Sequence, residues 1–182
     1  MNSKILTAEI EVPKEITARV TNNTVTVKGK KGEVTRSLPS KKITIKLEGS
    51  MIVIEAKKAS KNEKTMVGSY QSHIKNMLKG CMEGHQYSLK IASLHFPMNV
   101  SVTKTQFIIK NFLGEKVPRV INITNGVNIK VEGDHVNVEG VKLEDVSQMA
   151  ASIEQLTRIR NRDTRIFQDG IYITVKDGKS IM

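Results

Sequence analysis

Four arginines gather near the C-terminal end of the chain, in the stretch Thr157–Ile173 (TRIRNRDTRIFQDGIYI). They are Arg158, Arg160, Arg162 and Arg165. A guanidinium group stays charged near neutral pH, and its planar fork of donors fits the oxygens of a phosphate. The stretch therefore predicts a surface that contacts an anion. The alternative is a solvated helix end, where basic residues offset the negative end of the helix dipole.

Residue patterns for catalysis or metal binding are missing from the sequence. The candidate metal ligands are His73, His85, His95, His135 and Cys81. They show no ligand spacing such as CxxC or HxxxH. There is no GxSxG nucleophile motif and no GxxxxGK[ST] phosphate loop. We therefore predict no catalytic residue, no metal site and no cofactor, and expect that the chain is not an enzyme.

The net charge of +11 and the pI near 9.8 predict an anionic partner, with nucleic acid ahead of a membrane. The charge is uneven. Residues 1–90 hold 17 Lys+Arg and 8 Asp+Glu, which gives +9, whereas residues 91–182 hold 12 and 10, which gives +2. Most basic residues of the first half are lysines, and the second half holds the arginine cluster. The less charged half therefore carries the more focused patch.

Length and hydropathy describe a globular chain that is not exported. The 182 residues suffice for one ordinary domain or two small ones. No run of 18 apolar residues predicts a membrane span, and the N-terminus has no apolar segment of signal-peptide length. The single cysteine, Cys81, cannot form an internal disulfide, which fits a reducing cytoplasm.

The elements of the first half follow from the period of its apolar residues. β-branched residues in alternation predict strands, and apolar residues at spacings of three and four predict a helix. The predicted strands are one ending at Pro13, a hairpin over 24–27 and 34–38, a second hairpin over 43–47 and 51–54, and a strand over 87–91. A helix is expected between the capping box Ser60–Glu63 and Gly80.

The chain then repeats itself. Ile10-Glu-Val-Pro13 matches Leu94-His-Phe-Pro97, the turn after Lys28 matches the turn after Lys110, and Ile45-Lys-Leu-Glu-Gly49 matches Ile129-Lys-Val-Glu-Gly133. A second helix is predicted over 143–160. Landmarks at nearly constant spacing indicate a tandem duplication. We therefore predict an α+β fold in which a small domain occurs twice, each copy a mainly antiparallel β-sheet packed against one α-helix, over residues 1–82 and 83–182.

The aromatic content of the chain separates two modes of nucleic-acid binding, stacking on single strands and contact with folded RNA. The chain has seven aromatic residues, no tryptophan and no RNP motif, so binding of single strands by stacking is disfavoured. Lysines on hairpin turns and arginines after a helix suit contacts with the phosphates and 2′-hydroxyls of folded RNA.

Several strings resemble the large-subunit ribosomal protein L6 family, in its archaeal and eukaryotic form. They are KGKKGEVTRSLP, SHIKNMLKGCMEGHQYSLKI and RNRDTRIFQDGIYI, and the resemblance covers essentially the whole chain. It implies a structural constituent of the large ribosomal subunit, in the cytoplasm. The family binds large-subunit ribosomal RNA near the sarcin–ricin loop, at the base of the acidic stalk where translation factors dock. Expected partners are thus ribosomal RNA and neighbouring ribosomal proteins, including those of the stalk base, with translation factors nearby and no membrane.

The resemblance also implies which residues contact RNA, because the second domain makes most RNA contacts in the family. The candidates there are Lys110, Lys116, Arg119, Arg158, Arg160, Arg162, Arg165, Lys176 and Lys179. A further candidate is the turn Lys28, Lys30 and Lys31 of the first domain, for which a solvated turn is the alternative.

Two features of the hairpin turns can be tested by a structure. Phe112 and Leu113 stand where the first copy has a lysine turn, and they either wedge against a partner or fold back on the domain. Gly32 and Gly114 should occupy equivalent turns with positive φ if the repeats align there.

Two other classes of function stay open from the residues alone. One is a basic protein–protein adaptor that binds an acidic partner such as a stalk protein. The other is a small hydrolase whose site is not legible in the sequence.

Overall fold

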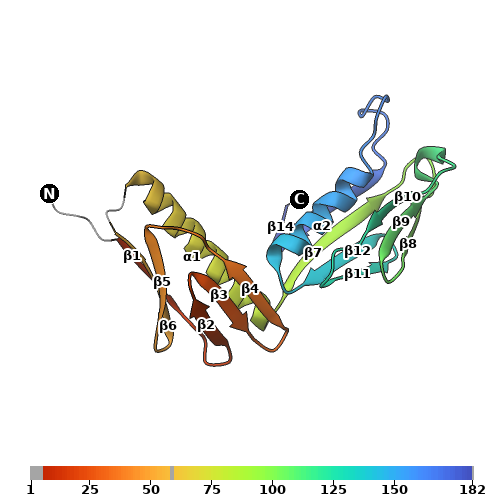
Figure 1. Ribbon diagram of the computed structural model, residues 1–182. Coiled ribbons are helices and arrows are strands. Elements are labelled where there is room, and N and C mark those ends of the chain that lie inside the picture. The colour runs from red at the N-terminus through yellow and green to blue at the C-terminus, as the bar shows by residue number, and fades with distance from the viewer. Residues whose placement is uncertain (1–5, 58–59, 182) are drawn as a thin grey trace. The chain divides into compact units, whose positions relative to one another are not determined.

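The computed structural model describes residues 6–57 and 60–181. The chain divides into two compact units, Met1–Gly84 and His85–Met182, each with its own sheets and helix (Figure 1). No described helix is long and apolar enough to cross a membrane.

The described residues of the first unit form two antiparallel three-stranded sheets and one helix. One sheet has the order β1-β6-β5 and the other the order β2-β3-β4. The elements are β1 (Leu6–Glu11), β2 (Thr17–Thr21), β3 (Thr24–Lys28), β4 (Glu33–Ser37), β5 (Ile43–Glu48), β6 (Met51–Ala56) and α1 (Lys61–Met82). The alternation of inward and outward residues sets the register, since Ile10, Ile52 and Ile54 all face the core.

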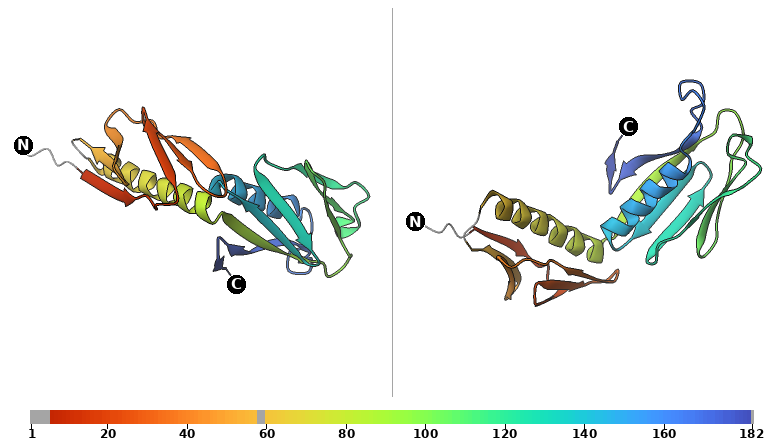
Figure 2. Two further views of the ribbon diagram at one scale, coloured as in Figure 1. Left: turned by 90° about the horizontal axis from the view of Figure 1, so that it is seen from below. Right: turned by 45° about the horizontal axis from the view of Figure 1, so that its top comes forward.

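The helix α1 begins at the capping box that the sequence predicted. The backbone N–H of Ser60 donates to Oε2 of Glu63 at 2.9 Å. Side chains at spacings of three and four residues are buried on one face of α1: Val67, Tyr70, Ile74 and Met77. This face packs on β1, β3 and β6, so one helix covers strands of both sheets (Figure 2).

The second unit repeats this arrangement with an enlarged sheet. Its sheets have the orders β11-β12-β7-β13-β14 and β10-β9-β8. The elements are β7 (His85–Ala92), β8 (Asn99–Val102), β9 (Gln106–Lys110), the 3₁₀ turn η1 (Phe112–Gly114), β10 (Arg119–Asn122), β11 (Val127–Glu132), β12 (His135–Gly140), α2 (Leu143–Leu156), β13 (Gly170–Lys176) and β14 (Lys179–Ser180).

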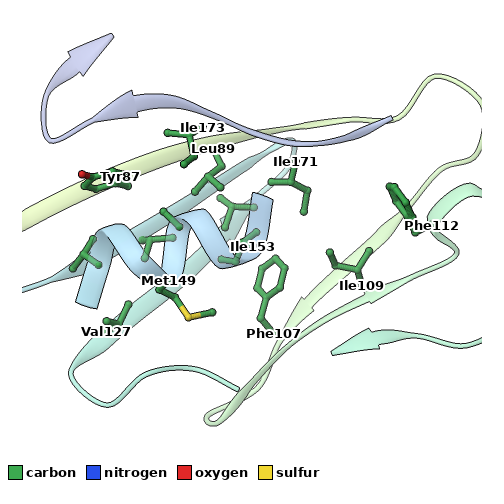
Figure 3. Close-up of a cluster of buried hydrophobic side chains, with 14 of the residues drawn as sticks. Tyr87, Leu89, Phe107, Ile109, Phe112, Val127, Met149, Ile153, Ile171 and Ile173 are labelled. Carbon is green, nitrogen blue, oxygen red and sulfur yellow. The ribbon is translucent and has the colours of Figure 1, made fainter. Parts of the chain in front are cut away.

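The buried core of the second unit lies between α2 and both sheets (Figure 3). Phe107 and Ile109 come from β9, Ile153 from α2 and Ile171 from β13, and all four are fully buried. Fully burying a side chain of this size stabilises a fold by about 1.5–3 kcal/mol. The core thus fixes the C-terminal end of α2 and the start of β13. The arginine cluster lies in the segment of chain between these two points.

The α+β fold and the tandem duplication are confirmed, because each unit combines antiparallel strands with one helix. Each unit contains two sheets. Strands β2 and β8, which complete the smaller sheets, were not predicted. In β2 the alternation of apolar and polar residues that would indicate a strand is weak, because its inner positions hold the small Ala18 and the half-buried Val20.

The strand predicted over 87–91 corresponds to β7 and lies within the predicted second copy, residues 83–182. Strand β7 follows α1, and it pairs with β12 and β13 of the second unit and lies at the centre of that sheet. It is therefore the first strand of the second copy.

The strand registers correct one landmark of the repeat. Ile10 pairs with Ile52, and Leu89 pairs with Val136, which is the counterpart of Ile52 in the second copy. Leu89 is thus the counterpart of Ile10, and the segment Leu94–Pro97 forms a bend after β7. The match between the two proline-ended strings is a similarity of composition and does not mark equivalent positions.

Candidate nucleic-acid interface

The arginine cluster lies in a loop between α2 and β13. The sequence predicted a helix as far as Arg160, but α2 ends at Leu156. Thr157 causes the early end, because its hydroxyl donates to the carbonyl of Glu154 at 3.0 Å and accepts from the N–H of Ile171 at 3.0 Å. The buried Thr157 side chain therefore joins the end of the helix to the start of β13, and the arginines follow in the loop.

A turn around Asp163 shapes the middle of this arginine loop (residues 158–169). The carboxylate Oδ1 of Asp163 accepts from the N–H of Arg165 at 2.9 Å, and the carbonyl of Asp163 accepts from the N–H of Phe167 at 3.0 Å. Asn161 adopts a left-handed conformation with φ 58°, which asparagine tolerates better than most residues. The loop is thus held by its own backbone contacts.

A buried carboxylate fixes the far end of the arginine loop. Asp169 is 1% exposed and accepts from the backbone N–H of Leu94, from the N–H of His95 at 3.1 Å and from Nδ1 of His95 at 2.7 Å. Burial alone would raise the pKa of Asp169, but the hydrogen bonds from His95 and Leu94 outweigh it and lower that pKa. The charged Asp169 therefore ties the arginine loop to the segment after β7.

Two aromatic residues, Phe167 and Tyr172, pack at the C-terminal end of the arginine loop. The ring of Phe167 lies 4.8 Å from the ring of His95 and 4.8 Å from the guanidinium carbon of Arg162. Tyr172 folds over Gly170, where an added Cβ would lie 2.9 Å from the tyrosine Cζ. The Tyr172 hydroxyl donates to the Gln168 carbonyl at 3.0 Å, so residues of the FQDGIYI string contact the end of the loop.

The four arginine side chains of the loop all reach solvent. Arg158, Arg160, Arg162 and Arg165 are exposed, and the Arg165 side chain is 90% exposed. Arg165 lies 3.4 Å from Asp163, an exposed pair that contributes little stability. The loop thus presents four positively charged side chains on a surface that an anion can reach from solvent.

Arg119 differs from the other candidates, because its guanidinium is used inside the second unit. It donates two hydrogen bonds to the Glu115 carboxylate, at 2.5 and 2.8 Å, and one to the Leu156 carbonyl at 2.6 Å. It also lies 4.2 Å above the ring of Phe112. The hydrogen bonds from Arg119 lower the pKa of Glu115. Arg119 thus joins the β9–β10 connection to the end of α2.

The hairpin turns of the two copies differ. Phe112 and Leu113 fold back on the domain, being 1% and 9% exposed. The second-copy connection also contains η1, with Asn111 in a left-handed conformation. Gly32 has φ 157° and Gly114 has φ 78°. Both values are positive, but the conformations differ, so the expected equivalence of the two turns is wrong.

The remaining lysine candidates of the second unit occupy two separate places. Lys110 and Lys116 are exposed at the β9–β10 connection, which Arg119 joins to the arginine loop. Lys176 and Lys179 pair with each other in the β13–β14 hairpin. They lie at the opposite end of β13 from the loop, about 20 Å away for a strand of this length. The structure therefore brings the first pair near the arginines and separates the second pair from them.

The lysine turn of the first unit is held against α1. Lys28, Lys30 and Lys31 are exposed, and the N–H of Lys31 donates to the Cys81 carbonyl at 3.1 Å. A Cβ at Gly29 would lie 2.5 Å from the same carbonyl oxygen, so the turn requires glycine there. Lys30 pairs with Glu15 at 2.7 Å, with both side chains largely exposed.

Within the described residues, no three side chains of His, Cys, Asp or Glu are grouped as a metal site. His85 and His95 each contact an aspartate instead, Asp177 at 3.0 Å and Asp169 at 2.7 Å. Sequence reasoning missed these pairs and the roles of Thr157 and Glu115. Each pair joins residues more than 70 positions apart, so no local pattern could have shown it.

Comparison with known proteins agrees with this architecture. The family model for ribosomal protein L6 matches residues 12–84 and 96–170, one match in each unit. The chain is 46% identical over 175 residues to large ribosomal subunit protein uL6 of Methanococcus vannielii, which covers 96% of both chains. It is 46% identical to the protein of that name from Methanocella arvoryzae (92% of this chain, 96% of the relative) and 45% identical to that of Natronomonas pharaonis (91% and 94%). The chain belongs to the ribosomal protein L6 family.

Proposed function

We propose that this protein binds large-subunit ribosomal RNA through its arginine loop, near the sarcin–ricin loop and the base of the acidic stalk, where translation factors dock. As a member of the L6 family, it is a structural constituent of the large subunit of the cytoplasmic ribosome and not an enzyme. The observation that carries the proposal is the fixed loop with four solvent-exposed arginines.

The geometry of the loop supports phosphate contacts over base contacts. Its two ends are fixed by Thr157 and Asp169, which reduces the conformational entropy that the loop backbone loses when an anion binds. One guanidinium group can donate two parallel hydrogen bonds to two oxygens of a phosphate. Several arginines in one loop therefore suit a folded RNA backbone with closely spaced phosphates. Lys110 and Lys116 lie on the neighbouring connection and extend the same positive surface.

The other candidates differ in how they would contribute. Lys176 and Lys179 lie directly opposite each other, an arrangement of like charges that a bound anion would relieve. The lysine turn of the first unit is exposed and positive, but Lys30 already has a carboxylate partner. Arg119 contributes by holding the β9–β10 connection against α2.

The test is the affinity of the purified chain for a transcribed large-subunit RNA fragment that contains the sarcin–ricin loop. We expect the triple variant Arg158→Ala, Arg160→Ala and Arg162→Ala to bind at least ten times more weakly. Each lost phosphate contact should also lower the slope of log affinity against log salt by about one unit. Filter binding over a salt series measures both quantities.

The matched control is the triple variant Lys14→Ala, Lys41→Ala and Lys64→Ala, which removes the same charge from exposed positions of the first unit. We expect it to keep nearly the wild-type affinity. Equal losses in the two triple variants would contradict the assignment, because they would reflect net charge alone. An affinity for acidic proteins in place of RNA would favour the adaptor alternative.

A further inference from the structure

The two copies of the domain differ at one edge of the larger sheet. In the second unit, β7 lies between β12 and β13. Its counterpart β1 pairs, among the described residues, with β6 alone. The place that β13 takes beside β7 is therefore open beside β1, since the chain leaves α1 for the second unit.

The outward backbone groups of β1 can be identified from the pairing. In an antiparallel pair, successive residues direct their N–H and C=O groups to alternate sides of the strand. The N–H of Val12 donates to the Ser50 carbonyl at 2.8 Å, so the even-numbered residues of β1 face β6. Thr7, Glu9 and Glu11 consequently direct their backbone groups to the free edge, and all three residues are exposed.

The equivalent groups of β7 bind β13 and the turn that follows it. Because Leu89 is the counterpart of Ile10, Gln86 and Ser88 correspond to Thr7 and Glu9. The Gln86 carbonyl accepts from the N–H of Asp177 at 2.9 Å, and the Ser88 carbonyl accepts from the Thr174 hydroxyl at 3.0 Å. The duplicated fold thus already accommodates one more antiparallel strand at this position.

The inward side chains also differ between the copies. His85 and Tyr87 of β7 are 1% and 8% exposed. Their counterparts in β1, Leu6 and Ala8, are only half-buried. An added strand with apolar residues at alternate positions would cover them. In the second unit this end of β7 lies beside Lys176, which is opposite Tyr87, and Asp177, which contacts His85.

We propose that the outer edge of β1 is a protein-binding site that takes an extended segment of a different protein by antiparallel strand addition. Main-chain hydrogen bonds to Thr7, Glu9 and Glu11 would hold the segment, and contact with the half-buried Leu6 and Ala8 would favour apolar residues at its alternate positions. Its solvent-facing residues are basic, because the carboxylates of Glu9 and Glu11 are exposed on the outer face of β1. Opposite charges on neighbouring strands stabilise the pairing.

A second copy of this chain fits the edge poorly. Two β1 strands paired about Glu9 would place one Glu9 carboxylate opposite the other, and like charges in that position are destabilising. The partner is thus a chain with alternating apolar and basic residues. This surface is distinct from the arginine loop, so the proposal stands apart from RNA binding.

The first test uses a synthetic heptapeptide of alternating lysine and isoleucine, titrated into the full-length protein and followed by nuclear magnetic resonance. We expect it to bind and to slow the exchange of the amide protons of Thr7, Glu9 and Glu11. Glu9→Pro removes an outward N–H but no bond to β6, so the affinity should fall at least tenfold. The matched control is Leu47→Pro on β5, whose N–H also points away from β6, and it should leave the affinity unchanged.

A second variant keeps the test decisive if proline disturbs the strand. Glu9→Lys combined with Glu11→Lys retains every backbone donor, and we expect it to weaken peptide binding at least fivefold with an unchanged circular dichroism spectrum. Equal peptide affinity in the wild type, Glu9→Pro and the double lysine variant would overturn the proposal, as would no binding at millimolar peptide.

The assembled large subunit provides an independent readout. A photo-crosslinking residue, p-benzoylphenylalanine, in place of Glu9 should form a crosslink to a neighbouring protein. A crosslink to RNA, or none, would contradict the proposal, and a dimer of the purified chain lost in Glu9→Pro would assign the edge to a second copy. Glu9→Pro should bind the RNA fragment as the wild type does, which separates this proposal from the proposed function.

Discussion

Arginines of the second unit have two different roles, although their side chains are the same. Arg158 and Arg160 are exposed in a loop, whereas Arg119 is 22% exposed and joins three parts of the unit. A residue type alone cannot separate these roles. The difference depends on the positions of Glu115 and Leu156, and the second of these lies 37 positions away in the chain.

Arg119 should therefore matter more for stability than for RNA affinity. We expect Arg119→Ala to destabilise the second unit by about 2 kcal/mol, because hydrogen bonds to charged groups are lost and the Leu156 carbonyl loses its partner. Arg119→Lys should lose most of the same stability, since an ammonium group cannot bind Glu115 through two parallel bonds. Native-state hydrogen exchange of the α2 amides measures the change in that unit alone.

The matched comparison is Arg160→Ala, which removes an exposed arginine of the same unit and should change the exchange of α2 by less than 0.5 kcal/mol, a usual limit for surface substitutions. If Arg119→Ala left α2 exchange unchanged and weakened RNA binding as much as Arg160→Ala, the structural role of Arg119 would be refuted.

At the scale of single elements, the N-terminus of α1 combines a capping box with an ion pair. Glu63 accepts from the Ser60 backbone and pairs with Lys42 at 2.8 Å, while its side chain is only 10% exposed. The hydrogen bond from Lys42, followed by those from Ser60, lowers the pKa of Glu63 from an ordinary value of 4.5 to about 2. The charged carboxylate thus links the helix start to the segment before β5.

The lowered pKa of Glu63 makes the stability of α1 depend on pH. A carboxyl group with a lower pKa in the folded state stabilises the fold fully above its unfolded pKa, and this contribution is lost as the pH falls through the folded value. We expect α1 to lose protection from hydrogen exchange between about pH 4.5 and 2. Glu63→Gln should be less stable near pH 7 and should flatten this dependence.

A suitable control is Glu83→Gln, which changes a carboxylate at the other end of α1. Its pH dependence should follow that of the wild type. A Glu63→Gln variant with the wild-type slope would show that other carboxylates cause the loss.

Elements with strong local signals could be predicted from the sequence. The capping box and the spacing of Val67, Ile74 and Met77 predicted α1, and alternation predicted β5 and β6. The end of α2 could not be predicted in this way. Apolar spacing continues through Ile159, but the Thr157 hydroxyl bonds to Ile171, and that bond depends on the tertiary fold.

For the whole molecule, the duplication was legible in the sequence, but the pairing of β7 with β12 and β13 was not. A strand that follows a helix can pair in either neighbouring sheet, and its partner β13 lies about 80 residues further along the chain. The arginine cluster was likewise visible as a group of charges. Its supports, such as the bond from His95 to Asp169, could not be read from local sequence.

The assignment of β7 can be tested with two fragments of the second unit. A fragment of residues 85–182 contains every strand of its own sheets, so we expect it to fold with the circular dichroism spectrum of an α+β domain. A fragment of residues 93–182 lacks the central strand of the larger sheet, so it should stay unfolded. Equal folding of the two fragments would contradict the central position of β7.

The central position of β7 also sets an order in time during synthesis of the chain. Every strand of the first unit has its partner within residues 1–84, so that unit can complete its sheets early. Strand β7 emerges next but meets β13 only about 80 residues later, which takes roughly 4 to 16 s at usual rates of translation. Strand β12 can pair with one edge of β7 about 45 residues after β7 is made, but the other edge stays unpaired until β13 is made. The nascent second half is therefore the part that most needs protection from aggregation until its last strand has been made.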